Sequence, residues 1–160
     1  MITMTAAPAS LRPATAADAP RLSELVHAAY GHYVARVGGP PRPMTDDYAA
    51  VVRSQQVTVA ERGGEIVGLI VLAVGDEGFA VDNVAVDPQH QGSGVGRALL
   101  EHAEDAARRA GFDSIHLYTH ERMTENLALY ARIGYVEYDR RDHGGARLVY
   151  LRKGLVRPRA

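Results

Sequence analysis

A glycine-rich loop between a strand-like segment and a helix-like segment constrains this chain more than any other feature. The stretch "NVAVDPQHQGSGVGRALL" (83–100) passes from apolar residues through Gly92, Gly94 and Gly96 into a helical pattern. Glycines let backbone N–H groups approach a ligand closely, and the N-terminus of the next helix adds about half a positive charge. The stretch therefore predicts a strand, a phosphate-binding loop and a helix, in that order.

Three familiar motifs with similar glycines do not fit this loop. A Walker A loop needs a lysine after its last glycine, and none follows here. The dinucleotide fingerprint G-x-G-x-x-G has a different spacing and belongs after the first strand of an open parallel sheet, whereas this loop follows the fourth predicted strand. The nucleophile elbow G-x-S-x-G needs a glycine two residues before the serine, and Gln91 stands two before Ser93.

The rest of the chain predicts an α/β domain with a mixed sheet. Residue patterns favour strands at 10–15, 57–62, 65–74, 78–86, 114–120, 135–140 and 147–152 and helices at 15–30, 44–56, 95–110 and 124–133. The order β-α-α-β-β-β-α-β-α-β-β predicts a mostly antiparallel sheet of six to seven strands flanked by about four helices.

Length and composition indicate a single domain and exclude several classes of function. The 160 residues fit one domain, expected at 9–153, with flexible tails at 1–8 and 154–160. The formal net charge of −1 gives no support for a nucleic-acid partner, and no apolar run approaches the ~20 residues that span a membrane. No signal-peptide pattern opens the chain, so we expect a cytoplasmic protein.

The sequence also argues against disulfides and metal sites. It contains no cysteine, which excludes thiolate ligands and a cysteine nucleophile. His116 and His120 lie four apart on a predicted strand and share a face, but no third ligand accompanies them. We therefore expect no metal.

Two separate stretches resemble the GCN5-related N-acetyltransferase (GNAT) family. The residues 91–96 follow "VAVDP" and match the family's acyl-CoA loop, [QR]-x-x-G-x-[GA], at the end of a strand. The later stretch "LALYARIGYVEY" (127–138) resembles the family's A-x-x-L-Y-x-x-x-G-F/Y motif. The predicted order of strands and helices is also that of the family, so the resemblance covers roughly residues 10–152.

The resemblance implies transfer of an acetyl group from acetyl-CoA to a primary amine of a small molecule or peptide by direct attack. A non-catalytic acyl-CoA-binding sensor on the same fold is the alternative, because a fold does not fix a function. A dinucleotide-binding oxidoreductase is a further rival, which binding of NADH in place of CoA would reveal. The sequence does not identify the acceptor. A strand edge near the C-terminus could pair with a second copy, so a homodimer is possible.

The resemblance places acetyl-CoA on the strand end, the loop and the first turn of the next helix. Loop amides and Arg97 would face the pyrophosphate, and the strand end would contact the pantetheine arm and the acetyl carbonyl if its neighbour splays away. Many relatives carry an asparagine where this chain has Met123, so Asn126 is considered in its place. The expected cofactor-binding residues are Val84, Ala85, Val86, Gln91, Gly92, Ser93, Gly94, Val95, Gly96, Arg97 and Asn126.

Tyr130 corresponds to the family's general acid, which protonates the departing CoA thiolate. A phenol holds a proton at neutral pH because its ordinary pKa is about 10. The alternative is a core tyrosine on an amphipathic helix.

The general base is less defined. The glutamate of ribosomal-protein-acetylating relatives corresponds here to Tyr118 and does not carry over. Asp82 is the first candidate, because strand alternation would put it on the face of Val84 and Val86. His120 and Glu121 are second candidates, and a solvated or capping role for Asp82 remains open.

The acceptor pocket is expected from the early helices and the stretch 30–44. Tyr30 and Tyr33 stand there with His32 and Arg36, and aromatic groups with polar tips suit a polar amine, a peptide N-terminus or a protein contact. The expected substrate-binding residues are Tyr30, Tyr33, His120 and Glu121.

Overall fold

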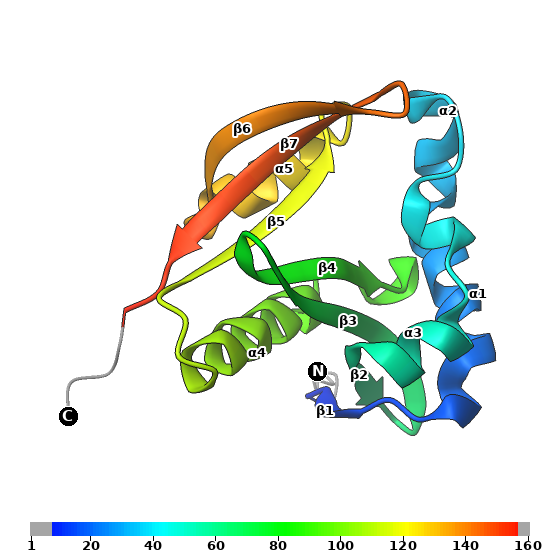
Figure 1. The fold of residues 1–160 in the computed structure, drawn as a ribbon. Helices are drawn as coiled ribbons and strands as arrows, with labels where there is room; N and C mark the ends of the chain where they lie inside the picture. The colour runs from blue at the N-terminus through cyan, green and yellow to red at the C-terminus, as the bar shows by residue number, and fades with distance from the viewer. Residues whose placement is uncertain (1–7, 157–160) are drawn as a thin grey trace, which may run out of the picture.

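The computed structural model describes residues 8–156 and contains a seven-stranded sheet with helices packed against it (Figure 1). The strands are β1 (Ser10–Pro13), β2 (Gln56–Arg62), β3 (Glu65–Gly75), β4 (Gly78–Val86), β5 (Ser114–His120), β6 (Val136–His143) and β7 (Ala146–Gly154). The helices are α1 (Ala19–Tyr30), the short α2 (Val34–Val37), α3 (Tyr48–Ser54), α4 (Val95–Arg109) and α5 (Thr124–Arg132).

The strands lie in the order β1-β2-β3-β4-β5-β7-β6. Every neighbouring pair is antiparallel except β4 and β5, which are parallel. The predicted mixed, mostly antiparallel fold is therefore confirmed, and the order of elements matches apart from the inserted α2.

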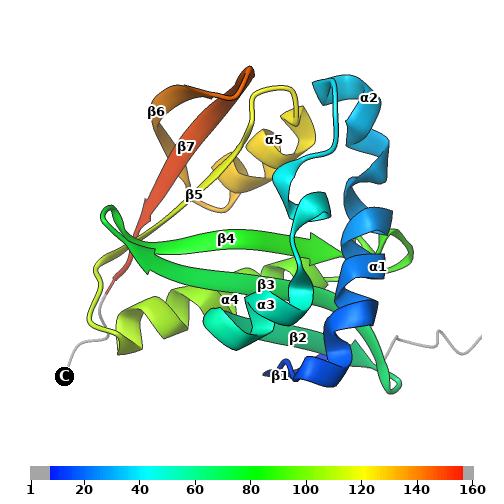
Figure 2. The ribbon, with the colours of Figure 1, turned by 45° about the vertical axis from the view of Figure 1, so that its right-hand side comes forward.

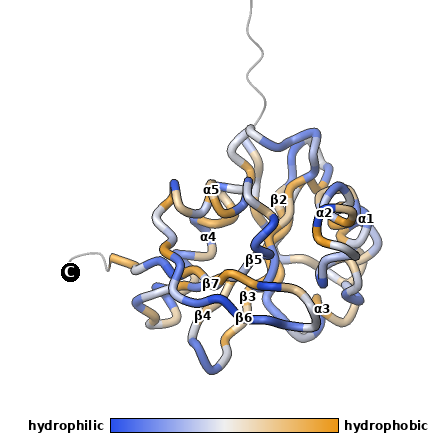
Figure 3. The backbone as a smooth tube through the Cα atoms, turned by 90° about the horizontal axis from the view of Figure 1, so that it is seen from above, coloured by the Kyte–Doolittle hydropathy of each residue, from blue (hydrophilic) through white to orange (hydrophobic). Residues whose placement is uncertain are grey.

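Helices cover both faces of the sheet (Figure 2). On one face α4 buries Leu99 and Ala103 against Ile70 of β3, and on the other α1 buries Leu22 and Leu25. Helical spacing of the apolar residues aligns them in a stripe on each helix, which explains why these segments fold as helices against the sheet. Figure 3 shows hydrophobic stretches of the strands between the helices on either side.

β4 and β5 pair over only two residues and then diverge (Figure 1). Their register joins Ala80 to His116 and Val81 to Leu117. Beyond this point β5 continues to pair with β7 as far as His120, but not with β4. The C-terminal halves of β4 and β5 therefore form an open wedge, as expected for a strand end that contacts a ligand through its backbone.

A β-bulge interrupts β4 at Asp82. The β3–β4 register shifts between Val71 and Leu72, and Asp82 has no partner in β3. Val81 and Val84 both pack toward the α4 side although they are three residues apart, so one step of the alternation is lost. The alternation argument that placed Asp82 on the face of Val84 is therefore wrong, because counting by twos fails across a bulge.

Two predicted boundaries also differ from the structure. The helix expected at 44–56 is shorter, because Asp47 caps it by accepting hydrogen bonds from two backbone N–H groups and the chain is extended again at Gln56. The C-terminal boundary expected at 153 is too early, because Leu155 is buried and its N–H donates to Asp113 O at 2.8 Å. Of the expected tails, residues 1–7 and 157–160 lie outside the described residues.

Candidate active site

Two cavities adjoin where β4 and β5 diverge. The loop cavity, of about 530 Å³, is lined by Ala29, Tyr30, His32, Tyr33, Val84, Ala85, Val86, Gln91, Gly92, Gly94, Gly96, Arg97, Leu100, Glu125, Asn126, Leu129 and Tyr130. The strap cavity, of about 490 Å³, is lined chiefly by the segment 37–43, by β4 and β5 on both sides of the wedge, and by the β6–β7 turn. Tyr30, Val84, Asn126 and Tyr130 line both cavities, so a ligand in one would meet a ligand in the other at these residues.

The glycine loop shapes the loop cavity through its backbone conformation. Gly92 and Gly94 have φ angles of +78° and +90°, which side-chain-bearing residues rarely adopt. A Cβ atom at either position would meet nothing within 4 Å, so conformation rather than crowding explains these glycines. Gly94 is the N-cap of α4, and the loop therefore delivers the helix N-terminus to the cavity.

The first turn of α4 presents N–H groups without partners. The first hydrogen bond of this helix runs from Ala98 N to Gly94 O, at 3.0 Å. The N–H groups of Val95, Gly96 and Arg97 precede it, and no acceptor among the described residues meets them. Free N–H groups and the positive end of the helix dipole together attract an anion.

The end of β4 turns further N–H groups toward the open wedge. Asp87 N donates to Val67 O of β3 at 2.9 Å, so the alternation beyond the bulge points the backbone groups of Val84 and Val86 the other way. The Val84 carbonyl group is consistent with this direction, because its oxygen accepts a hydrogen bond from the Tyr30 hydroxyl at 3.0 Å. An N–H at this edge is placed to donate to a carbonyl oxygen of a bound ligand.

Tyr130 stands at the junction of the two cavities. Its side chain is buried, and its ring packs edge-on against Tyr135 with 5.7 Å between ring centroids. Burial, and to a lesser extent nearby Tyr33, raises the pKa of the Tyr130 phenol well above its usual value. No acceptor among the described residues takes its proton, so this proton is available to a ligand.

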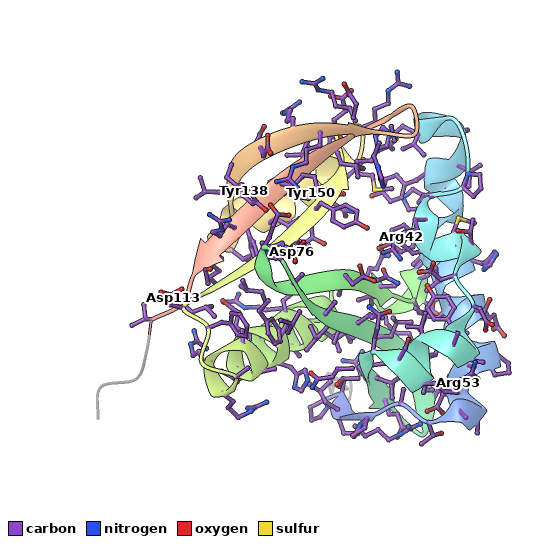
Figure 4. All side chains as sticks on the ribbon, in the orientation of Figure 1. Arg42, Arg53, Asp76, Asp113, Tyr138 and Tyr150 are labelled. Atoms are coloured by element: carbon purple, nitrogen blue, oxygen red, sulfur yellow. The ribbon has the colours of Figure 1, made fainter. Side chains whose placement is uncertain are left out.

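Asp82 lines the strap cavity beside Arg42, which Figure 4 labels and which contacts both β4 and β5. Arg42 Nη2 donates to Asp82 O at 2.9 Å and lies 3.4 Å from Asp82 Oδ2. Arg42 also donates through Nε to the Tyr118 hydroxyl of β5 at 3.0 Å and through Nη1 to Asp46 Oδ2 at 2.6 Å. Asp82 Oδ1 has no partner among the described residues and can accept a proton or hydrogen bond from a ligand.

The two second candidates for a base are less suited to that role. His120 lines the strap cavity, but its Nδ1 accepts the N–H of Arg122 at 3.0 Å. The neutral ring then carries its proton on Nε2 and offers a donor. Glu121 lies outside both cavities, contrary to expectation, because its carboxylate pairs with Arg140 at 3.4 Å and Arg147 at 3.8 Å.

The two expected substrate-binding tyrosines serve different cavities. The Tyr30 hydroxyl lies 2.9 Å from Asn83 Oδ1 and 3.0 Å from Val84 O, which fixes α1 to β4 beside both cavities. Burial raises the pKa of Tyr30 well above its usual value, so it remains a neutral donor. Tyr33 lines the loop cavity and not the strap cavity, because its hydroxyl donates to Glu125 Oε2 of α5 at 3.3 Å.

All expected cofactor-binding residues except Ser93 and Val95 line the loop cavity. The Val95 side chain is 1% exposed and belongs to the core under α4, although its N–H is among the free groups described above. The Ser93 hydroxyl is turned away and donates to His90 O. Both residues follow the loop pattern in sequence, but the pattern does not say which side chains face the ligand.

A buried polar group beneath the wedge was not predicted from the sequence. Asn83 is 5% exposed, and its Nδ2 donates to the Tyr48 hydroxyl at 3.2 Å, which donates to Pro43 O at 2.6 Å. An asparagine inside the apolar run "VDNVAV" is the available signal, because a buried amide needs partners. Arg42 was also missed, since a cation among prolines in "PPRP" has no periodic pattern.

Residues 8–156 show neither a metal-binding cluster nor a membrane-spanning helix. They contain no group of three or more His, Cys, Asp or Glu side chains that could hold a metal ion. None of their helices is long and apolar enough to cross a membrane.

Comparison with known proteins found related acetyltransferases. An "IAA acetyltransferase" of Azospirillum brasilense is 37% identical over 81 residues, which are 49% of this chain and 53% of that protein. A "[Ribosomal protein bS18]-alanine N-acetyltransferase" of Escherichia coli (strain K12) is 40% identical over 55 residues, 34% of this chain and 37% of that protein. The matched regions thus span about half or less of these relatives.

The fold and the family rest on separate matches. The crystal structure of PaiA N-acetyltransferase from Thermoplasma acidophilum, in complex with coenzyme A, superposes with a TM-score of 0.78, at 16% identity over 92% of this chain and 99% of that chain. This likeness confirms the fold. The family model "Acetyltransferase (GNAT) domain" matches residues 53–137, more than half of the chain, and includes the glycine loop and Tyr130. The chain therefore belongs to the GNAT acetyltransferase family.

Proposed function

We propose that this protein transfers the acetyl group of acetyl-CoA to a primary amine of a small molecule or peptide. One observation carries the proposal: a loop cavity beside the free N–H groups of α4 and a second cavity lined by the Asp82 carboxylate meet at Tyr130 and Val84, in the wedge between β4 and β5. Family membership supports acetyl transfer, and a relative named for acetylating an alanine supports an amine acceptor.

The loop cavity suits coenzyme A in charge and position. The free N–H groups of Val95, Gly96 and Arg97 match a pyrophosphate, and the Arg97 side chain adds a cation. The open edge of β4 leads from there to Tyr130 and can accompany an extended pantetheine arm. When bound, acetyl-CoA supplies an acetyl group activated as a thioester.

Three groups of the chain would act on the reacting atoms. The Val84 N–H, at the open edge of β4, donates to the acetyl carbonyl oxygen and stabilises the negative charge that develops there. Asp82 accepts a proton from the amine through Oδ1 as the new N–C bond forms. Tyr130 gives its proton to the sulfur as the C–S bond breaks, so the products are an amide and a thiol.

The strap cavity would receive the acceptor. Its walls combine glycines and prolines of the segment 37–43 with apolar groups such as Leu117 and Leu148. Asp82 is the one acidic residue among the described residues that line this cavity, and it pairs with Arg42. A compact amine or a peptide N-terminus in this cavity would have both Asp82 and Tyr130 in the wall around it.

A turnover screen tests the proposal. Purified protein is mixed with acetyl-CoA and a panel of small amines, aminoglycosides, polyamines and peptides with free N-termini, and thiol release is followed. The proposal predicts saturable release with at least one acceptor class, and formation of the acetylated product by mass spectrometry. Tight CoA binding with no turnover over the whole panel would favour the sensor alternative, and binding of NADH in place of CoA would overturn both.

A further inference from the structure

The wall of the strap cavity is largely apolar and carries few charges. Among the described residues that line it, Asp82 is the one acidic residue and Arg42 the one arginine, and no lysine is present. Of the two histidines, His120 accepts an N–H at Nδ1 and His143 is exposed at the β6–β7 turn. The apolar surface comes from residues such as Val37, Pro40, Pro41, Pro43, Met123 and Leu148.

The positive charge of Arg42 is already compensated. Arg42 Nη1 lies 2.6 Å from Asp46 Oδ2, and Arg42 Nη2 lies 3.4 Å from Asp82 Oδ2. Its Nε and Nη2 also donate to the Tyr118 hydroxyl at 3.0 Å and to Asp82 O at 2.9 Å. Two carboxylates therefore face one guanidinium, which leaves one negative charge in excess beside the cavity.

The backbone of the segment 37–43 adds little that could bind an anion. Prolines at 40, 41 and 43 have no N–H group. The N–H groups of Gly38 and Gly39 both donate to Val34 O, at 3.0 Å. A carboxylate on the acceptor would therefore leave water, face the excess negative charge and find the arginine of this wall already paired.

We propose that the acceptor is a monoamine with an apolar body and with no carboxylate beside its amine. The inference deepens the proposed function and rests on it, because it takes the strap cavity as the acceptor site. A protonated amine offsets the excess negative charge, and Asp82 Oδ1 can accept its hydrogen bond and then its proton. Polyamines and aminoglycosides carry further ammonium groups, and the described residues of this wall offer no second carboxylate to pair with them.

Three matched compounds test the inference in the thiol-release assay. 2-Phenylethylamine and phenylalaninamide share the benzyl group and the primary amine of phenylalanine but lack its carboxylate. The protein should acetylate both with a kcat/KM about 10-fold or more above that for phenylalanine, spermidine or kanamycin. Faster turnover of 2-phenylethylamine would indicate a free small amine, faster turnover of phenylalaninamide would indicate the N-terminus of a peptide, and either result supports the inference.

Asp46→Asn tests the electrostatic reasoning without changing the wall of the cavity. Asp46 contacts Arg42 but does not line the cavity, so the substitution removes the excess negative charge and frees Arg42 Nη1. The ratio of kcat/KM for phenylalanine to that for phenylalaninamide should rise about 3-fold or more at low salt, and the rise should shrink as salt is added. Comparison of this ratio between two proteins cancels the intrinsic reactivities of the two amines.

Asp47→Asn is the matched control. It removes the same charge at the next residue, where the side chain caps α3 and does not contact Arg42. Asparagine also caps helices well, so the variant should fold and should leave the ratio unchanged.

Three results would overturn the inference. Phenylalanine accepted as well as phenylalaninamide by the wild-type protein, or a polyamine or aminoglycoside as the best acceptor, would do so and leave the proposed function standing. An equal loss of kcat/KM for both amines in Asp46→Asn, without a change in their ratio, would limit Asp46 to a structural role. Binding of acetyl-CoA with no turnover of any amine would instead refute the proposed function, and the inference with it.

Discussion

Replacing Tyr130 by phenylalanine removes one hydroxyl from the junction of the two cavities and leaves the ring in place. Tyr130 is only 8% exposed, and its edge contact with Tyr135 does not involve the hydroxyl. Because no described residue accepts the Tyr130 proton, the substitution breaks no hydrogen bond within residues 8–156. The free energy of unfolding should therefore change by less than about 0.5 kcal/mol.

The expected effect on catalysis is much larger. A positioned general acid contributes about 10²-fold or more to the rate, and a factor of 10² corresponds to about 2.7 kcal/mol of transition-state stabilisation. Acetyl-CoA affinity should change little, since the proton moves only as the C–S bond breaks. Raised by burial, the pKa of Tyr130 keeps the phenol protonated, so its loss of a proton should not shape the pH profile near neutrality.

Tyr135→Phe provides a close control for this experiment. The Tyr135 hydroxyl is buried and has no partner among the described residues, its ring lies against the Tyr130 ring, and it lines neither the loop cavity nor the strap cavity. Turnover, calorimetric affinity and thermal melting of both variants give the comparison. A fully active Tyr130→Phe variant, or the same loss of kcat in both variants, would refute the general-acid role.

Four further substitutions test the site and the core. Gly96→Glu should keep α4 folded, because a carboxylate suits a helix N-terminus, but should weaken acetyl-CoA binding more than about 10-fold by calorimetry. Unchanged affinity would refute the phosphate-binding role of the loop. Asp82→Asn should lower kcat/KM by roughly 10²–10⁴ in the thiol-release assay, and an unchanged kcat/KM would exclude Asp82 as the base. Gly68→Ala should destabilise by about 1–3 kcal/mol in urea unfolding, because a Cβ would lie 2.9 Å from Val95 Cγ1; an unchanged midpoint would contradict this packing. Burial lowers the pKa of His116, so the free energy of unfolding should fall as the pH drops below about 6.5, the pKa of histidine in the unfolded chain. The fall should be smaller in His116→Gln, and the same dependence of unfolding free energy on pH in both proteins would contradict this expectation.

Local patterns account for what was predicted correctly from the sequence. The glycines at 92 and 94 require an unusual backbone conformation, and the apolar spacing after them requires a helix, so the loop and α4 follow from neighbouring residues alone. The order of strands and helices along the chain also followed from residue patterns, whereas the interpretation of Tyr130 followed from the resemblance to the family. The roles of Tyr130 and Asp82 remain predictions.

Contacts between distant residues account for what was wrong or missed. The bulge at Asp82 arises from the register against β3, which residues 78–86 alone do not reveal. Arg42 meets Tyr118 across 76 residues of chain, and Tyr30 meets Asn83 across 53. Such pairs depend on how the sheet brings segments together, so no local pattern indicates them.

The backbone of the glycine loop decides where a blocking substitution is informative. The sequence alone points to Gly94, because it lies at the centre of the motif. Its φ of +90° means that any side chain there strains the backbone as well as blocking the ligand. Gly96 has no such angle, and a Cβ atom added there would lie 3.5 Å from Val86 Cγ2, which is ordinary contact, so a substitution at Gly96 separates binding from folding.

A crystal structure of the complex with acetyl-CoA tests the central claim most directly. We predict the pyrophosphate on the N–H groups of Val95, Gly96 and Arg97, with the thioester in the wedge between β4 and β5. The Tyr130 hydroxyl should lie within about 3.5 Å of the sulfur, and the Val84 N–H should face the acetyl oxygen. Coenzyme A bound outside the loop cavity, or a thioester beyond reach of Tyr130, would contradict this mechanism.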